Sequence, residues 1–301
     1  MKPTSNRSDS QRAQEILKKV RRIEISTRRI VDSVLSGQYH TRFKGQGMQF
    51  SDLREYYHGD DIRHIDWKVT ARTQTAHIKK FEEERELNVY FIVDVSGSGE
   101  FGSKDKSKHE ALSEVAALLA FAAVKNGDKV GLILFSDKVE RHIPPKKGRP
   151  HALRLVTELL YHEPQGRGTD LAAALDFCWE VVKTKAVVFV ISDFFAKDYE
   201  RSLRRLSRRN DVIALRMRDQ REVSVPAVGL IEMQDAENGE PFWVNTSSAL
   251  FKEEFGTRMQ VIDAELDQTF GQAGVEHLDL WTHEDYFNRV VEFFRKRRRK
   301  R

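Results

Sequence analysis

The sequence predicts an α/β fold, doubly wound around a mostly parallel sheet, with a small N-terminal β-containing module and a C-terminal hairpin insertion. From residue 87 onward, near-continuous apolar runs of strand length alternate with longer segments of helical period. Turn residues, chiefly Gly, Ser and Asp, follow most of the apolar runs. A chain of 301 residues, 40% of them hydrophobic, is long enough to bury a full core.

The regular part of the chain predicts six strands, six helices and one hairpin. The hairpin is expected to turn at Asn238-Gly239, a dipeptide that favours tight two-residue turns. In chain order, the elements are strand 87–95, helix 107–126, strand 129–137, edge strand 138–143, helices 151–161 and 170–182, strand 186–194, helix 199–209, strand 211–217, hairpin 228–246, helix 248–270, strand 276–281 and a helix from 284.

Changes in composition divide the chain into three predicted parts. Residues 1–37 form a basic amphipathic N-terminal helix, since apolar residues recur at near-helical spacing among many Arg and Lys residues. Residues 38–86 mix glycine turns, aromatic residues and short alternating runs, which predicts a small β-containing module that carries the motif GDDIRHIDW. Residues 87–301 form the α/β domain with its C-terminal hairpin, helices and basic tail.

Composition also narrows the classes of function. The single cysteine, Cys178, excludes an intramolecular disulfide framework and a multi-cysteine zinc site. No apolar run approaches the length of a membrane span and the N-terminus shows no apolar signal core, so we expect a cytoplasmic protein without integral membrane insertion. The net charge of +5 is more than accounted for by the basic run Arg295 to Arg301. Nucleic-acid binding is therefore not expected from overall charge, and we interpret the run as a solvated helix end.

The turn after the strand at 87–95 is the first candidate site. Gly97-x-Gly99-x-x-Gly102 matches a dinucleotide fingerprint only in its glycines, because the helix begins several residues too late and no acidic residue stands at the expected ribose position. A phosphate-binding loop is also excluded, because Ser103 occupies the place of the required lysine.

A cation site fits this turn better. Asp94, Ser96 and Ser98 place three oxygen-bearing side chains at the end of the strand. Thr169 and Asp193 come from two further loops that we expect at the same edge of the sheet. Oxygen ligands of this kind suit a hard cation, Mg²⁺ above all, with Mn²⁺ or Ca²⁺ as alternatives.

This set, D-x-S-x-S followed by G-T-D and S-D, resembles the metal-ion-dependent adhesion site of von Willebrand factor A domains over roughly residues 87 to 220. The resemblance implies that Ser96, Ser98 and Thr169 coordinate the cation through hydroxyl oxygens, with Asp94 and Asp193 acting directly or through water. It also implies that an acidic side chain of a protein ligand completes the coordination. No nucleophile with a positioned base accompanies the turn, so we expect binding rather than catalysis.

The preceding module contains a second dense cluster of charged residues. We interpret it as an ion-paired turn, although paired carboxylates also leave open a second metal or catalytic site. The cluster comprises Arg54, Asp60, Asp61, Arg63 and Asp66.

The strings LREYY and GDDIRHIDW, just ahead of an adhesion-type domain, are similar to those of the bacterial family called domain of unknown function fifty-eight, from about Gly45 to the C-terminal helix. That resemblance implies a partner for a MoxR-type AAA+ ATPase in the remodelling or maturation of client proteins. We therefore expect a cation-dependent adaptor subunit. Two alternatives stay open: a metal-assisted hydrolase in which Asp60, Asp61 or His64 assists, and binding of RNA or an anionic membrane by the basic ends.

Overall fold

The computed structural model describes residues 47–84, 86–97, 107–166, 168–223, 225–234 and 241–299. The chain divides into two compact units, Phe43–Leu87 and a larger unit of Met1–Arg42 with Asn88–Arg301. The predicted N-terminal helix and the candidate ligand Ser98 lie outside the described residues. Within the described ranges, no helix combines the length and apolar character required to cross a bilayer.

A six-stranded sheet forms the centre of the larger unit, in the order β10-β7-β6-β3-β4-β5. Neighbouring strands are parallel except for the antiparallel pair of β4 with the edge strand β5. The prediction of an α/β fold with a mostly parallel sheet is confirmed. The strands are β3 (Asn88–Asp94), β4 (Lys129–Phe135), β5 (Val139–Lys146), β6 (Ala186–Ser192), β7 (Asp211–Arg218) and β10 (Glu276–Trp281).

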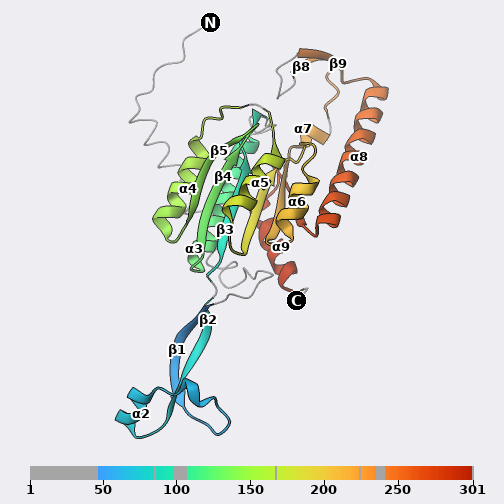
Figure 1. Cartoon of the computed structure of the whole chain (residues 1–301). Coiled ribbons are helices and arrows are strands. Elements are labelled where there is room, and N and C mark those ends of the chain that lie inside the picture. The colour runs from blue at the N-terminus through green and yellow to red at the C-terminus, as the bar shows by residue number, and fades with distance from the viewer. Residues whose placement is uncertain are drawn as a thin grey trace. The chain divides into compact units, whose positions relative to one another are not determined.

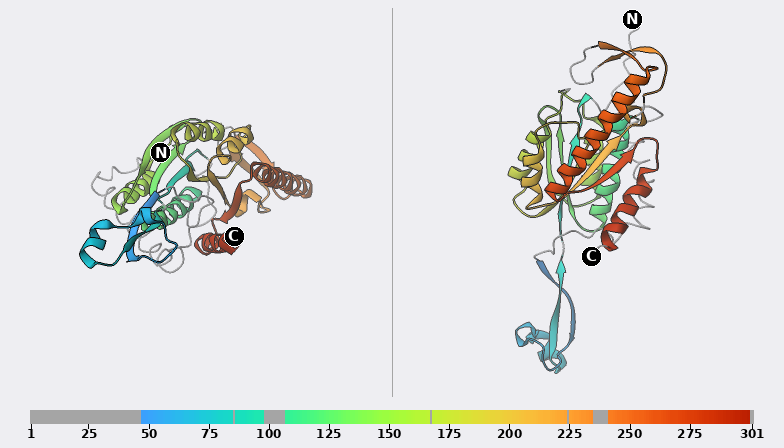
Figure 2. Two further views of the ribbon diagram at one scale, coloured as in Figure 1. Left: turned by 60° about the horizontal axis from the view of Figure 1, so that its bottom comes forward. Right: turned by 90° about the vertical axis from the view of Figure 1, so that its right-hand side faces the viewer.

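Helices cover both faces of this sheet, as Figures 1 and 2 show. One buried cluster joins the sheet to α3 (Lys108–Lys125), α4 (Arg149–Tyr161) and α9 (Tyr286–Arg299). The other joins it to α5 (Leu171–Val181), α6 (Glu200–Ser207) and α8 (Ala249–Ala273). With both faces covered, the inner strands can be apolar at every position, and all seven residues of β6 are buried.

The order of connections creates a switch point in the middle of the sheet. From β3 the chain passes through α3 to β4 on one side, whereas from β6 it passes through α6 to β7 on the other side. Because β3 and β6 are neighbours, the loops that follow them diverge onto opposite faces of the sheet. Ligands of open α/β sheets bind in the crevice outside such carboxyl ends. The fold therefore places the residues after β3 and β6 where a ligand site is expected.

Beyond β7 the chain forms a short helix and a two-stranded hairpin before it returns to the sheet through α8 and β10. The helix is α7 (Gln220–Val223), and the hairpin consists of β8 (Leu230–Gln234) and β9 (Pro241–Asn245). The predicted turn at 238–239 lies outside the described residues. Thr246 is buried and closes the base of the hairpin, because its hydroxyl accepts from Val228 N at 3.0 Å and donates to Gly229 O at 2.9 Å.

The smaller unit is a hairpin of β1 (Gly47–Glu55) and β2 (His77–Glu84), with a short 3-10 helix η2 (Ile62–His64) and helix α2 (Trp67–Thr73) between the strands. The strands pair in antiparallel fashion with a register shift between Phe50 and Asp52. Three large apolar side chains of this unit, Tyr57, Ile62 and Trp67, are exposed.

The basic C-terminal run is not uniformly solvated, in contrast to its interpretation from sequence. Arg297 lies on the buried face of α9, 8% exposed, and its guanidinium is 2.5 Å from Asp211 and 2.6 Å from Glu276. The exposed residues Arg295 and Lys296 fit the original interpretation. One arginine of the run therefore fastens α9 to the amino ends of β7 and β10.

Candidate cation site at the carboxyl edge of the sheet

Asp94 and Asp193 lie at the switch point between β3 and β6. Asp94 is the last residue of β3, and Asp193 directly follows β6, which pairs with β3 up to Val93 and Ile191. Both aspartates are nearly fully buried, at 4% and 7% exposure. The fold therefore brings together two predicted ligands that are far apart in sequence.

The carboxylate of Asp94 is held by hydrogen bonds from Ser96 and Ser192. Its Oδ1 accepts from Ser96 N at 2.9 Å, and its Oδ2 accepts from the Ser192 hydroxyl at 2.7 Å. Burial, followed by the negative charge of Asp193, nevertheless raises the pKa of Asp94 to about 6. The hydrogen bonds fix the orientation of the carboxylate without fully compensating its charge.

The loop after β3 and the loop ahead of α5 supply hydroxyl groups. Ser96 is buried beside Asp94, whereas Thr169 is half-buried just ahead of α5. Thr169 does not cap this helix, because Asp170 accepts from Ala173 N at 2.9 Å in the N-cap position. The Thr169 loop approaches the end of β4, since Asp170 N donates to Ser136 O over 2.7 Å.

Glu140 of β5 holds the chain that leads to Thr169. Its carboxylate accepts from the backbone N–H groups of Gln165 and Gly166, from the Ser136 hydroxyl, and contacts His162 Nε2 at 2.5 Å. Burial opposes ionisation of Glu140, but these hydrogen bonds outweigh it and lower the pKa to about 2. A larger residue at position 166 would displace the Asp137 side chain, because a Cβ atom there would lie 2.0 Å from Asp137 Oδ1.

Asp193 has a cationic partner that the sequence analysis missed. The ammonium of Lys108, at the start of α3, lies 2.9 Å from Asp193 Oδ2 and 2.6 Å from Glu222 Oε1. Burial opposes the charge of Lys108, but the two carboxylates outweigh it and raise its pKa. Lys108 stands among other lysines in a polar stretch of sequence, so only the fold distinguishes it from a surface residue.

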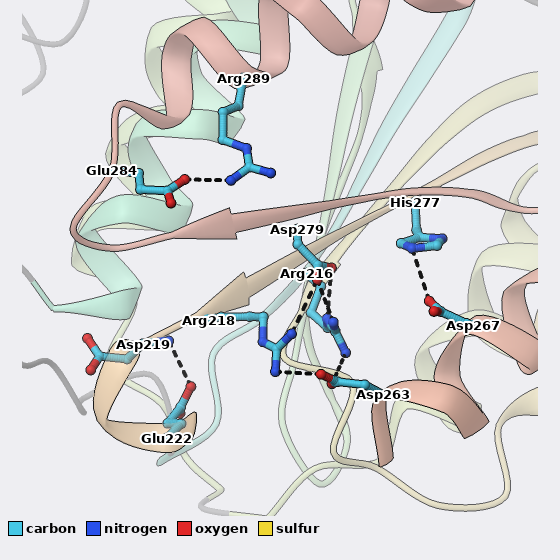
Figure 3. A network of polar contacts seen from close by, with 10 residues as sticks. All are labelled: Arg216, Arg218, Asp219, Glu222, Asp263, Asp267, His277, Asp279, Glu284 and Arg289. Carbon is cyan, nitrogen blue, oxygen red and sulfur yellow. Dashed lines mark hydrogen bonds and ion pairs between the residues drawn. The ribbon is translucent and has the colours of Figure 1, made fainter. Parts of the chain in front are cut away.

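Glu222 links this ion pair to the C-terminal elements. Its Oε2 accepts from Asp219 N at 2.9 Å, and Asp219 in turn accepts from the Thr282 hydroxyl at 2.6 Å. Figure 3 shows Glu222 on α7 directly after β7. No sequence signal marked Glu222, because α7 is a single turn within a stretch that has no clear periodicity.

A dense network of ion pairs fastens β10 and α8 to β7 in the same region, as Figure 3 shows. Arg216 contacts Asp279 at 2.5 Å and Asp263 at 2.9 Å, and Arg218 contacts the same two acids at 3.4 and 3.0 Å. The guanidinium of Arg218 also lies 4.8 Å from the ring centroid of Trp281. The two arginines and the two aspartates neutralise one another, so we assign this network a structural role.

The chemistry of the donor set fits a divalent cation. Asp94, Ser96, Thr169 and Asp193 offer carboxylate and hydroxyl oxygens at one edge of the sheet, the ligand types that Mg²⁺, Mn²⁺ and Ca²⁺ prefer. Burial, and then the negative charge of Asp193, raises the pKa of Asp94. Among the described residues, no group of three or more His, Cys, Asp or Glu side chains is placed to hold a metal ion, so a cation at this edge would depend on hydroxyl oxygens as well as the two carboxylates.

The charged residues of the smaller unit are paired with one another. Arg54 binds Asp60 through two contacts of 2.7 Å, and Arg63 binds Asp61 at 2.8 Å. Asp66 caps α2 by accepting from Lys68 N at 3.0 Å. The arginine hydrogen bonds are the main cause that lowers the pKa values of Asp60 and Asp61 to about 2. Both carboxylates are therefore poor proton acceptors.

Comparisons with known proteins identify relatives along most of the chain. Residues 52–265 match the family described as "Protein of unknown function DUF58". The uncharacterized proteins Mb1516 of Mycobacterium bovis and Rv1480 of Mycobacterium tuberculosis are each 30% identical over 283 residues, covering 93% of this chain and 89% of the relative.

Similar solved structures include a conserved hypothetical protein, BatB, from Bacteroides thetaiotaomicron, with a TM-score of 0.48, 15% identity and coverage of 70% of this chain and 98% of that one. They also include the VWA domain of SpRpn10, with a TM-score of 0.40, 11% identity and coverage of 68% and 94%. The strand order of the sheet and the position of the candidate site come from the structure of this chain and not from these neighbours.

Proposed function

The chain belongs to the DUF58 family of proteins of unknown function, and from this premise we propose that it is a divalent-cation-dependent protein-binding subunit. The observation that carries the proposal is the buried pair Asp94 and Asp193 at the switch point of the sheet, with hydroxyl oxygens beside it. The cation ligands would be Asp94, Ser96, Ser98, Thr169 and Asp193, with Mg²⁺ as the first choice and Mn²⁺ or Ca²⁺ as alternatives.

A bound cation would offer an acidic side chain of another protein a point of attachment. Only two of the five proposed ligands carry charge, and the three hydroxyl oxygens are weaker ligands, so the cation can still attract a further carboxylate. An adhesion-type role of this kind agrees with the von Willebrand factor A-like order of motifs and strands. It needs no general base.

We further propose that the protein works together with a MoxR-type AAA+ ATPase, and that the two remodel or mature client proteins. Support for this part comes from the resemblance of the LREYY and GDDIRHIDW motifs alone.

Neither alternative gains a supporting observation. A metal-assisted hydrolase would need Asp60, Asp61 or His64 as a proton acceptor, but both aspartates are bound by arginines that favour their ionised forms. Binding of RNA or an anionic membrane by the basic tail could not use Arg297, which is buried in two ion pairs, and would depend on exposed residues of the run such as Arg295 and Lys296.

The proposal is tested by calorimetric titration of Mg²⁺ and Mn²⁺ into the wild type and an Asp94→Ala/Ser96→Ala variant, with circular dichroism to verify the fold of each. We expect saturable binding by the wild type and none by the variant. Asp176→Ala, which removes a carboxylate on α5 outside the site, is the matched control and should bind normally. Equal binding by the site variant and the wild type would refute the proposed ligands. A pull-down tests the proposed partner: the protein should capture the ATPase when Mg²⁺ is present and lose it when a chelator removes the ion.

A further inference from the structure

Lys108 brings a permanent positive charge into the candidate cation site. Its side chain is 2% exposed, and its ammonium lies between Asp193 at 2.9 Å and Glu222 at 2.6 Å. A lysine is almost never buried to this degree unless its charge is paired. The first residue of α3 thus reaches one of the two carboxylates that would bind the divalent cation.

The formal charges around the site determine how the Lys108 ammonium affects binding of a divalent cation. Asp94, Asp193 and Glu222 can each contribute one negative charge, and Lys108 contributes one positive charge. A divalent cation bound by Asp193 would experience repulsion from an ammonium that contacts the same carboxylate. The lysine therefore opposes cation binding while it stabilises the cation-free protein.

We propose that Lys108 is a tethered cation that competes with the divalent ion for Asp193 and so sets the affinity of the site. The inference rests on the proposed function and names the residue that regulates its cation site. Competition of this kind keeps the binding of the ion weak until a further negative charge joins the site. The acidic ligand of the proposed function would bring that charge, so the lysine favours joint binding of ion and ligand.

Glu222 makes the exchange possible. When the ion takes Asp193, the ammonium keeps a charged partner in Glu222, so no buried charge is left unpaired. Glu222 is itself held in place, because its second oxygen accepts from Asp219 N at 2.9 Å (Figure 3). Asp219 is completely buried and bonded to Thr282, which anchors α7 to the chain after β10.

The experiment compares calorimetric Mg²⁺ and Mn²⁺ affinities of the full-length wild type, Lys108→Met and Lys108→Met/Glu222→Gln. The double variant removes one charge of each sign, so it maintains the net charge and provides a folded comparison if the single variant does not fold. Lys183→Met is the control, because it removes an exposed lysine beyond α5 at the amino end of β6, on the opposite edge of the sheet.

We expect Lys108→Met to bind the ions at least about tenfold more tightly than the wild type, since a unit positive charge a few ångströms from the ion is removed. The double variant should also bind them more tightly, but by a smaller factor, because it frees Asp193 from the ammonium and at the same time loses the negative charge of Glu222. Lys183→Met should bind like the wild type. Folded Lys108 variants with unchanged or weaker affinity would overturn the role of Lys108 and leave the proposed cation site standing. Binding only by the Lys108 variants would support that role and refute cation dependence of the wild type. Absence of binding in every protein would overturn both.

Discussion

The hydroxyl of Ser192 donates a hydrogen bond to Asp94 Oδ2 over 2.7 Å, and so joins the ends of two strands across 98 residues of sequence. Both side chains are buried. A carboxylate oxygen has two acceptor positions, so the contacts from Ser192 and from Ser96 N leave further positions on Asp94 for a cation. The strand pairing thus orients a ligand while leaving it able to bind.

Asp94→Asn should stabilise the cation-free protein at pH 7 by about 1–2 kcal/mol while abolishing stabilisation by Mg²⁺. Burial and Asp193 raise the pKa of Asp94 to about 6, above the ordinary value of 3.8, so the folded state binds more protons than the unfolded state between these values. The stability of the cation-free wild type therefore rises as pH falls from 7 towards 4. Urea denaturation at pH 7 and pH 5, with chelator and with Mg²⁺, measures both effects.

The difference in the free energy of unfolding between Asp94→Asn and the cation-free wild type should be smaller at pH 5 than at pH 7, because Asp94 is largely protonated in the folded wild type at pH 5. A variant that is less stable than the wild type at both pH values would contradict this account of the site.

Glu140→Gln should lower the free energy of unfolding by about 1–3 kcal/mol at pH 7, because a neutral amide cannot accept all the hydrogen bonds that reach this carboxylate. Despite the cost of burial, those bonds lower the pKa of Glu140 to about 2 from an ordinary 4.5. The stabilisation is present above the unfolded value and is lost as pH falls through the folded one. Denaturation curves at pH 7 and pH 3 should therefore show a smaller difference at the lower pH. A constant difference would indicate a loss of packing instead.

The sheet was predictable because its strands are near-continuous apolar runs and its helices keep their period between them. The charged contacts of the site were not. Lys108 is one of three lysines within five residues, and nothing local shows that it turns inwards. Thr169 and Asp170 are adjacent polar residues ahead of a helix, and only the structure assigns the cap to Asp170. Patterns reveal which face of an element is buried, whereas partners across the sheet depend on register.

Asp279→Asn should destabilise the protein by about 2–4 kcal/mol, because Arg216 and Arg218 are buried and would lose a shared counter-charge. Asp267→Asn is the matched control on α8, since Asp267 is 65% exposed and pairs only with His277 in the network of Figure 3. It should change stability by less than about 0.5 kcal/mol. Thermal unfolding of the two variants provides the comparison, and equal effects would show that the buried position of the arginines is unimportant.

Asp61→Asn should leave the Mg²⁺ affinity unchanged. The carboxylate of Asp61 is already occupied by Arg63, with contacts of 3.1 and 2.8 Å, and its pKa near 2 keeps it ionised at every pH at which the protein would be assayed. Calorimetric titration under the conditions used for Asp94→Ala/Ser96→Ala tests this expectation. Loss of cation binding in a folded Asp61→Asn protein would restore the hypothesis of a metal-assisted hydrolase.

Arg297→Met should destabilise the protein by about 3 kcal/mol, whereas Arg295→Met should have little effect. Both variants remove one positive charge from the same basic run and keep a long side chain. Arg297, however, compensates Asp211, which is 3% exposed, and methionine would leave that acid without this partner. Urea denaturation distinguishes the two positions. If both variants unfold like the wild type, Arg297 contributes nothing measurable, and the run is free to bind an acidic partner along its whole length.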